Sequence, residues 1–405
     1  MKNTTSSQIF LIHYGEIGLK GKNRSDFERK LRKNILYRLK NVISESSAPP
    51  QVKILQKYLT LTVPDKTNIA KVTAVLKKTY GIQWFAHTQT LPRASEIDQI
   101  TKKLVLQANS NPKPNGSFKV SCKRADKTFP LKSPEIEKLI GRKIIANTKH
   151  SKVNLTKPDQ EYFIEITPDQ IYLFNQKIKG PGGLPVGSSG RVLVLLSGGL
   201  DSPVAANLMA KRGCNIDFLH FHVNIPQENS KMLRLVKKIQ EYTDNGRLFL
   251  SSYLPFNMAL VDIKTNYELV LFRRFVFRIA QKVCTKNNIH AIVTGDNLGQ
   301  VASQTLENIT ASNDVLQNLV CYRPLIGFDK VEIITIAKEI GTYEISNEPG
   351  KDCCSIIDRH AKTRVSIEKI EQEENKIDNY EGLIKETLNE IYVLPTTNHN
   401  YPKIV

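Results

Sequence analysis

The stretch VLVLLSGGLDSPVAA, residues 192–206, constrains the fold more than any other part of the chain. The continuous apolar run at 191–196 predicts a short strand buried on both faces, as in a parallel sheet. Residues 202–213 have the pattern of a helix that stops at a glycine, and the glycine-containing turn 197–202 joins the two. A strand, a glycine turn and a helix in direct succession indicate an α/β domain that binds ligands beyond the carboxyl ends of its strands.

The same alternation continues downstream and sets the fold class. Strand patterns alternate with helical patterns, which predicts an open, doubly wound parallel sheet with helices on both faces. The charged segment 366–392 is expected to form a solvated helix that caps this domain. The predicted strands are 215–223, 247–254 and 290–296, and the predicted helices between them are 231–243 and 267–288.

The residues of the turn are suited to binding phosphate. Gly198 and Gly199 let backbone N–H groups approach an anion, and the N-terminus of the following helix adds partial positive charge. Ser197 and Ser202 can donate hydroxyl hydrogen bonds, whereas the carboxylate of Asp201 suits phosphate only through Mg²⁺. The turn matches neither GxxxxGK[ST] nor GxGxxG, so neither a γ-phosphate-cleaving P-loop nor dinucleotide binding is indicated. The alternative is a tight turn that uses glycine for geometry alone.

The charge of the chain is concentrated in its first part. Residues 1–180 hold 33 Lys and Arg against 14 Asp and Glu, while residues 181–405 hold 25 of each kind. A compact region with a net charge of +19 repels itself unless a polyanion offsets it, so we expect nucleic-acid binding there. A solvated basic surface without a partner is the alternative. The first residues lack the pattern of a secretory signal and no run suits a bilayer, so we expect a cytoplasmic protein without a membrane partner.

A linker coincides with the charge boundary. Residues 179–190, KGPGGLPVGSSG, are dense in glycine, proline and serine. Before the linker, residues 1–80 and 81–178 each mix strand and helix patterns and form two small α/β units. We therefore expect two N-terminal domains, the linker and a C-terminal domain at 191–405.

The six cysteines fall into two groups. Four of them, at 122, 214, 284 and 321, lie in apolar contexts and are expected in the core. Cys353 and Cys354 lie in the polar stretch NEPGKDCCSIID, where a disulfide between neighbours would be strained. Two free thiols in a reducing compartment suggest chemistry, although incidental loop cysteines are the alternative. The chain has no CxxC and no zinc-like spacing, so neither a structural metal nor an iron–sulfur cluster is predicted.

Several motifs together identify a family. SGGLDS after a buried strand resembles the PP-loop of ATP pyrophosphatases, which cleave ATP between the α and β phosphates. YGEIGLKGKNR (14–24), GPGGLPVGSSG (180–190), GDNLGQVASQTLENI (295–309) and RPLIGFDKVEI (323–333) are similar to the tRNA 4-thiouridine synthetase family. The resemblance covers about residues 8–370. It implies an N-terminal ferredoxin-like domain, a THUMP domain that binds tRNA and a PP-loop ATP pyrophosphatase domain.

The resemblance implies an ATP-dependent tRNA sulfurtransferase that adenylates uridine 8 and replaces its O4 with sulfur. Two alternatives are a PP-loop amide-forming ligase and a non-catalytic tRNA-binding protein with a vestigial nucleotide site. The residues expected to be catalytic are Asp201, Lys330 and Cys354. The spacing in Cys-Ser-Ile-Ile favours Cys354 over Cys353 as the family's catalytic cysteine. For Lys330, the alternative is a solvated lysine without a catalytic role. The expected ATP-binding residues are Leu196, Ser197, Gly198, Gly199, Leu200, Asp201, Ser202, Arg273, Gly295 and Gln300.

Other expectations are weaker. Gly295, Asp296 and Gln300 should lie near the adenylated base; the alternatives are a helix N-cap for Asp296 and a surface amide for Gln300. Arg323 is a second cationic candidate beside Lys330. A cysteine desulfurase or another sulfur donor is implied as a partner, and members of the family dimerise. No rhodanese-like segment is present, which leaves the resolving cysteine open, with Cys321 as one candidate. The expected tRNA contacts are Lys20, Lys22, Arg24, Lys123, Arg124 and Lys127.

Overall fold

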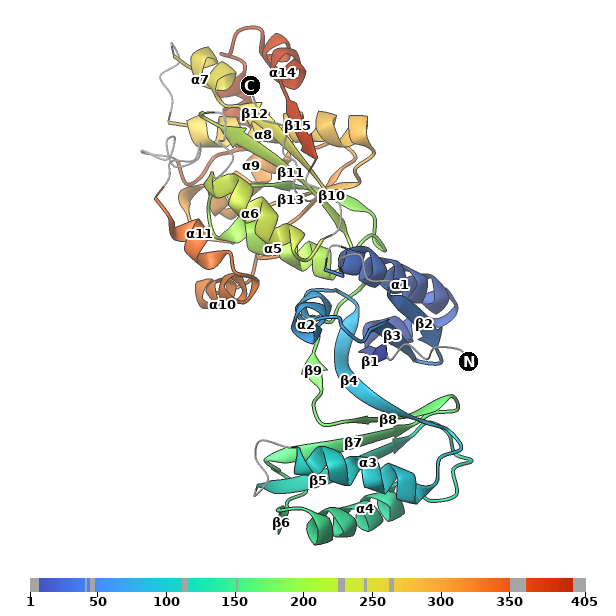
Figure 1. The fold of residues 1–405 in the computed structure, drawn as a ribbon. Coiled ribbons are helices and arrows are strands. Elements are labelled where there is room, and N and C mark those ends of the chain that lie inside the picture. The colour runs from blue at the N-terminus through green and yellow to red at the C-terminus, as the bar shows by residue number, and fades with distance from the viewer. Residues whose placement is uncertain are drawn as a thin grey trace. The chain divides into compact units, whose positions relative to one another are not determined.

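The computed structural model describes residues 7–40, 42–43, 48–110, 116–150, 152–224, 230–243, 246–261, 266–349 and 362–395. The chain forms two compact units, Met1–Gly183 and Leu184–Val405. We describe each unit by itself (Figure 1).

The first half of the N-terminal unit follows the order strand, helix, two strands, helix, strand. Its four strands pair antiparallel in the order β2-β3-β1-β4, which is the ferredoxin-like arrangement. Helix α2 begins where the side chain of Asn68 accepts hydrogen bonds from two backbone N–H groups. The elements are β1 (Ser7–Tyr14), two short 3₁₀ turns at Glu16–Leu19 and Gly21–Asn23, α1 (Arg24–Lys40), β2 (Gln51–Leu55), β3 (Tyr58–Pro64), α2 (Ile69–Lys77) and β4 (Ile82–Pro92).

The second half of this unit continues the same sheet. β4 pairs with β1 along its first residues and with β8 along its last, so one strand belongs to both halves. Helices α3 and α4 pack on this second sheet segment around a core that includes Phe118, Ile140 and Tyr162. The elements are α3 (Ile97–Asn109), β5 (Ser117–Arg124), α4 (Ser133–Asn147), β6 (Lys152–Val153), β7 (Gln160–Ile166), β8 (Gln170–Phe174) and β9 (Ile178–Lys179).

The C-terminal unit is built on a six-stranded sheet within the described residues. The strand order is β14-β13-β10-β11-β12-β15, and every pair is parallel except β12 with β15. Its elements are β10 (Arg191–Leu195), α5 (Asp201–Lys211), β11 (Asn215–His222), α6 (Lys231–Gln240), β12 (Arg247–Ser252), α7 (Leu254–Ala259), α8 (Glu268–Asn287), β13 (Ala291–Val293), η3 (Ala302–Gln304), α9 (Leu306–Asn313), β14 (Val320–Tyr322), α10 (Lys330–Ile340), α11 (Tyr343–Asn347), α13 (Ile367–Glu374), α14 (Tyr380–Asn389) and β15 (Tyr392–Pro395).

Helices lie on both faces of this sheet, which confirms the predicted doubly wound fold. In Figure 1, α5 and α6 lie in front of the strands and α8 lies behind them. The α8 face holds the main core, where Phe272, Phe275 and Phe277 pack against Leu193 and Phe249. The strand order reverses at β10, because β11 and β12 are added on one side of it and β13 and β14 on the other. Ligands bind at such a reversal, beyond the carboxyl ends of the strands, so we expect the ligand crevice between β10 and β13.

The tail differs from the solvated helix expected over 366–392. It forms two helices, and Ile370 and Ile384 are buried in the core while β15 extends the sheet. The carboxylate of Glu374 lies between the guanidinium groups of Arg274 and Arg278 on α8, with N–O distances of 3.2 and 2.5 Å. The apolar residues recur at helical spacing between charges, and that amphipathic pattern accounts for the burial. Among the described helices, none is long and apolar enough to cross a membrane.

Candidate active site

The glycine turn is closed by its own two serines. The Oγ atom of Ser202 accepts a hydrogen bond from the backbone N of Ser197 at 3.0 Å and lies 3.1 Å from the Ser197 hydroxyl. That hydroxyl accepts from the backbone N of Gly199 at 3.3 Å. β10 ends at Leu195 and α5 begins at Asp201, so the turn lies between the strand's carboxyl end and the helix N-terminus. This is the predicted position for an anion-binding turn.

Of the two leucines predicted to bind ATP, Leu196 is among the residues that line the neighbouring cavity and Leu200 is not. Leu196 is 3% exposed, and its carbonyl accepts a hydrogen bond of 2.9 Å from Nδ1 of His220 on β11. Leu200 is the N-cap residue of α5. Because a carbonyl can only accept, the His220 contact places the ring proton on Nδ1.

Gly295 is required by close packing against the same turn. A Cβ atom at this position would lie 2.7 Å from the backbone N of Ser202 and 2.8 Å from the carbonyl carbon of Asp201. Any other side chain would push the end of β13 away from the start of α5. The glycine therefore brings the segment after β13 up to the turn.

Asp201, Gln300 and Lys330 meet although they are far apart in the sequence. The Lys330 ammonium lies 2.7 Å from Oδ1 of Asp201, and the Gln300 amide donates to Oδ2 at 2.9 Å. Lys330 is the first residue of α10, which a capping box between Asp329 and Glu332 fixes at that point. The Lys330 side chain is 44% exposed, so its ammonium contacts both solvent and the carboxylate of the turn, and its catalytic role stays a prediction.

A second carboxylate beside the turn, that of Asp296, is buried, whereas that of Asp201 is partly exposed. Asp296 is 3% exposed, and Arg273 contacts it at 2.8 Å, Arg323 at 3.1 Å and the Thr294 hydroxyl at 2.8 Å. Burial alone would raise its pKa, but the two guanidinium groups and the Thr294 hydroxyl hold the pKa of Asp296 below its ordinary value. Asp296 is not the helix cap of the alternative interpretation, since η3 begins only at Ala302. Arg273 and Arg323 are thus held side by side.

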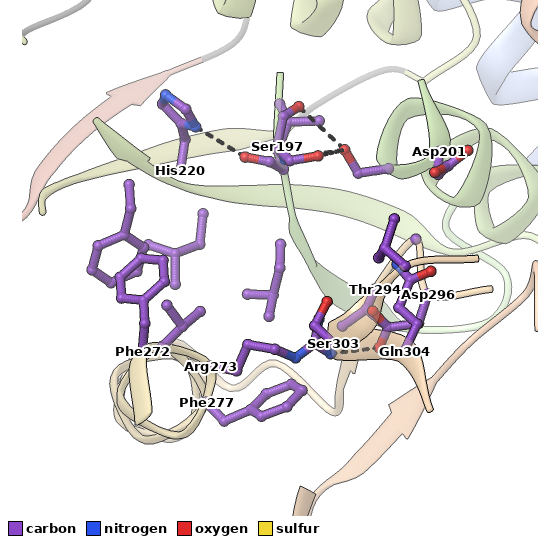
Figure 2. Close-up of a pocket in the computed structure, with 18 residues that line it drawn as sticks. Ser197, Asp201, His220, Phe272, Arg273, Phe277, Thr294, Asp296, Ser303 and Gln304 are labelled. Atoms are coloured by element: carbon purple, nitrogen blue, oxygen red, sulfur yellow. Dashed lines mark hydrogen bonds and ion pairs between the residues drawn. The ribbon is translucent and has the colours of Figure 1, made fainter. Parts of the chain in front are cut away.

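A cavity of about 230 Å³ lies beside the turn. Figure 2 shows Ser197 and His220 on one side and Phe272, Arg273 and Phe277 of α8 on the other. One wall is polar and the opposite wall is aromatic, which suits a ligand with a charged end and a flat apolar end. The residues that line it are Leu195, Leu196, Ser197, Asp201, Ser202, Leu219, His220, Phe221, Phe272, Arg273, Val276, Phe277, Thr294, Gly295, Asp296, Val301, Ser303 and Gln304.

Sequence reasoning missed part of this lining. Phe272 and Val276 are four residues apart on α8, and that spacing is the same for a core stripe and for a cavity wall. Ser303 and Gln304 stand in the quoted motif 295–309, which was the only available signal for them. His220 lies at the carboxyl end of β11, a position that points to the ligand edge once the strand order is known.

Of the four cysteines expected in the core, Cys214 and Cys284 are buried, whereas Cys122 and Cys321 are partly buried. Cys353 and Cys354 lie outside the described residues. Burial raises the pKa of Cys122 and of Cys284 to about 12 and that of Cys321 to about 11, and it also raises the pKa of Cys214. The nearby Arg323 lowers the Cys321 pKa but does not offset burial. These four thiols are therefore poor nucleophiles near neutral pH, which disfavours Cys321 as a resolving cysteine.

The predicted RNA contacts of the first basic motif remain near the surface. Lys22 is exposed. Lys20 lies 3.6 Å from Glu16 and over the Phe27 ring, and Nε of Arg24 lies 3.4 Å from Glu28. These surface pairs leave the cationic groups accessible to phosphate.

The second basic motif is engaged more tightly. Lys123 and Lys127 are both exposed, and Nζ of Lys123 also lies 2.9 Å from the buried carboxylate of Glu165, whose other oxygen faces His13 at 3.2 Å. Arg124 donates to the carbonyls of Leu131 and Phe129 and stabilises its own loop. Arg124 thus has a structural task that its charge did not indicate.

Comparisons with known proteins agree with this arrangement. The model of the ThiI family, described as thiamine biosynthesis protein, matches residues 187–379. The ThiI ferredoxin-like domain matches residues 9–86, and the THUMP domain matches residues 94–175.

Curated relatives and a solved structure match nearly the whole chain. A probable tRNA sulfurtransferase of Caldanaerobacter subterraneus subsp. tengcongensis is 36% identical over 375 residues, which cover 91% of this chain and 95% of the relative. A probable tRNA sulfurtransferase of Finegoldia magna is 36% identical over 390 residues, which cover 95% of this chain and 97% of the relative. A crystal structure of a 4-thiouridine synthetase–RNA complex with bound ATP matches with a TM-score of 0.84 and 32% identity, over 96% of this chain and 100% of that one. The chain therefore belongs to the ThiI family of tRNA sulfurtransferases.

Proposed function

We propose that this protein is an ATP-dependent tRNA sulfurtransferase that converts uridine 8 of tRNA to 4-thiouridine. The observation that carries the proposal is the meeting of the glycine turn with Asp201, Lys330 and Gln300 beside the cavity. The similarity to a 4-thiouridine synthetase with bound RNA and ATP supports the substrates. The basic N-terminal unit supports tRNA as the partner, because its excess charge suits phosphate contacts.

ATP fits the two kinds of wall in the cavity. We assign the phosphates to the turn, through the backbone N–H of Gly198 and the N-terminus of α5, and the adenine to the aromatic wall formed by Phe272 and Phe277. Lys330, whose ammonium pairs with Asp201 of the turn, is assigned to stabilise the charge that increases on the α-phosphate as the bond to the β-phosphate breaks. Arg273, held by Asp296, faces the same cavity as a second cation.

Mg²⁺ suits this site through Asp201 and the phosphates together. The Asp201 carboxylate lies at the turn with its oxygens directed to Lys330 and Gln300, and Mg²⁺ is often bound by one or two carboxylates plus substrate phosphates. Within the described ranges, no group of three His, Cys, Asp or Glu residues is placed to bind a metal by itself. When bound, Mg²⁺ supplies charge neutralisation to the phosphates.

The first chemical step activates the base. O4 of the uracil attacks the α-phosphorus of ATP, the bond to the β-phosphate breaks, and pyrophosphate leaves while N3 of the uracil loses its proton. The product is the O4-adenylated base, in which AMP replaces a poor leaving group. Lys330 acts on this step by stabilising charge, and Gln300 orients the Asp201 carboxylate.

The second step introduces sulfur. A persulfide on Cys354, formed by a cysteine desulfurase, attacks C4 through its terminal sulfur, and AMP leaves with the C4–O bond electrons. A second thiol then attacks Sγ of Cys354 and breaks the S–S bond of the former persulfide, so the outer sulfur stays on C4 as 4-thiouridine, reprotonated at N3. The two thiols form a disulfide that an external dithiol reduces. Free sulfide can attack C4 directly and needs no disulfide step. A reducing compartment such as the cytoplasm supplies the dithiol that this disulfide step requires, and we propose that the enzyme works there. We also propose that it works as a homodimer.

One assay separates this proposal from the alternatives. The protein is incubated with tRNA, ATP, Mg²⁺, a dithiol and either a desulfurase with cysteine or sodium sulfide, and the digested nucleosides are analysed by mass spectrometry. Thiolated uridine together with AMP supports the proposal, a new amide supports a ligase, and tRNA binding without AMP supports a non-catalytic role. Asp201→Ala should abolish AMP formation while tRNA binding survives, and unchanged AMP formation would remove Asp201 from the mechanism.

A further inference from the structure

Two loops bring the groups that contact the Asp201 carboxylate. Gln300 belongs to the loop 294–301 that follows β13, and Lys330 begins α10 directly after the loop 323–329. The two loops are separated by more than twenty residues of chain. Contacts between the loops are therefore needed to keep Gln300 and Lys330 together on one carboxylate.

Asn297 joins these two loops from a buried position. Its side chain is 8% exposed, and its Nδ2 atom donates to the carbonyl of Leu325 at 3.1 Å and to the carbonyl of Phe328. Carbonyl oxygens only accept hydrogen bonds, so the amide nitrogen must face them, and both of its N–H groups are used. Phe328 lies two residues before Lys330. The Asn297 amide therefore fixes the chain close to the point where α10 begins.

The two neighbours of Asn297 extend the contact between the loops. The backbone N of Leu298 donates to the carbonyl of Ile326 at 3.2 Å, and the carboxylate of Asp296 lies 3.1 Å from Nε of Arg323. Three consecutive residues thus hold the loop that precedes α10. Of these residues, Asn297 makes its contacts to that loop through a neutral side chain, so its substitution loosens the loop without changing the charge of the site.

The two side-chain contacts of Asn297 lie apart from the nucleotide cavity. Among the described residues that line the cavity, there is neither Asn297 nor any member of 323–330. The lining residue Gln304 is held by other bonds: its side chain accepts from the backbone N of Asn297 at 3.4 Å, and its backbone N donates to the carbonyl of Val301 at 2.9 Å. Both bonds use backbone N–H groups, so they remain when the Asn297 side chain is truncated.

We propose that Asn297 is a positioning residue for the adenylation step, which acts by holding Lys330 at the Asp201 carboxylate. This inference rests on the proposed function and on the role assigned there to Lys330. A cation stabilises a transition state only when it lies close to the developing charge, and a misplacement of about 1 Å can cost about 10²-fold in rate. The Lys330 side chain is 44% exposed and has a flexible stem, so the position of its backbone determines where the ammonium can reach.

A double-mutant cycle tests this inference. AMP formation with tRNA, ATP, Mg²⁺ and sodium sulfide is measured for the full-length wild type, Asn297→Ala, Lys330→Ala and the double variant. We expect Asn297→Ala to lower kcat about tenfold or more, while the KM for ATP changes less than about threefold. In the Lys330→Ala background the same substitution should cost less than about threefold, because the group that Asn297 positions is gone. Equal losses in the two backgrounds, or a loss confined to KM, would overturn the proposal.

A matched control and a second variant complete the design. Asn287 at the end of α8 also makes two side-chain hydrogen bonds, with Arg247 and with the carbonyl of Val283, but at the amino end of the sheet. Asn287→Ala should therefore leave both kinetic constants unchanged, and thermal unfolding is measured for every variant. Where Asn297→Ala does not fold, the cycle is run with Asn297→Ser, whose hydroxyl can donate only one hydrogen bond.

Failure of this inference differs from failure of the proposed function. AMP formation by Lys330→Ala at the wild-type rate would overturn the inference, because Asn297 would then have no catalytic group to position, although the enzyme would still thiolate tRNA. Absence of both AMP and 4-thiouridine from the wild-type reaction would instead refute the proposed function.

Discussion

The two ends of the C-terminal sheet hold the same chemical group in different surroundings. At the amino end, the buried carboxylate of Asp217 pairs with Arg191 at 2.6 Å and with Arg247 at 2.6 Å. At the carboxyl end, Asp296 pairs with Arg273 and Arg323. In the first cluster, Arg247 also donates to the side chain of Asn287 at the end of α8. In the second, Arg273 and Asp296 line the cavity beside the glycine turn. A buried carboxylate between two arginines therefore indicates a site only when its cations face a cavity.

The largest expected effect is at the carboxyl end. Lys330→Ala should lower AMP formation about 10³-fold, because it removes the cation that stabilises charge on the α-phosphate. Steady-state kinetics of AMP release check this, with thermal unfolding as the measure of intact fold. Lys338→Ala on the same helix, whose ammonium lies over the Tyr343 ring, is the matched control. A loss confined to the KM for ATP would show that Lys330 binds substrate without stabilising the transition state.

Thiol reactivity should be suppressed at both ends of the sheet. Cys284 lies on α8 and Cys321 on β14, and their raised pKa values leave about one thiolate in a thousand or fewer at pH 8. Alkylation by iodoacetamide, followed by peptide mass spectrometry, should be about 10²-fold slower at these positions than for an exposed thiol. Because the pKa is raised, the rate should increase about tenfold for each pH unit between 7 and 10. Fast labelling of Cys321 at pH 7 would restore it as a resolving cysteine.

At the amino end, the expected effect is on stability. Asp217→Asn leaves two arginines without their partner and should lower the free energy of unfolding by about 2 kcal/mol, since both guanidinium groups keep some contact with solvent. The kinetic constants of the folded enzyme should not change. Denaturant titration and AMP release on the same sample measure both. Asp296→Asn is the counterpart and should also lower AMP formation; if Asp217→Asn lowers it equally, the contrast between the two ends is wrong.

The smallest effect is expected in the basic half of the chain. Lys22→Glu should weaken tRNA binding about threefold at low salt and less at high salt, because one exposed phosphate contact becomes repulsive. Filter binding at two salt concentrations measures this. Lys286→Glu makes the same charge change in the half whose charges balance, and it should leave affinity unchanged. Equal weakening by both variants would mean that net charge, rather than the basic loop, determines binding.

The sequence predicts the fold class and the glycine turn because both depend on local patterns. A strand run, two glycines and a helix determine Ser197 to Ser202 almost without tertiary information. Contacts such as Asp201 with Lys330 are separated by more than a hundred residues, and only the family motifs indicate them. Charge alone also does not reveal the partners of a side chain. Arg124, which is predicted to contact tRNA, donates to carbonyls of its own loop, and its contact with tRNA stays a prediction. The burial of the tail, residues 366–392, was not predicted either, because many charged residues surround its apolar stripe and give it the composition of a solvated helix.

β4 has a consequence for engineering of the N-terminal unit. The ferredoxin-like match ends at residue 86 and the THUMP match begins at 94, yet the strand Ile82–Pro92 runs through the gap between them. A chimera that exchanges one of these modules by splicing at that seam would cut the one strand that pairs with β1 in the first module and with β8 in the second. Domain shuffling should therefore succeed only when the pair is transplanted as one cassette.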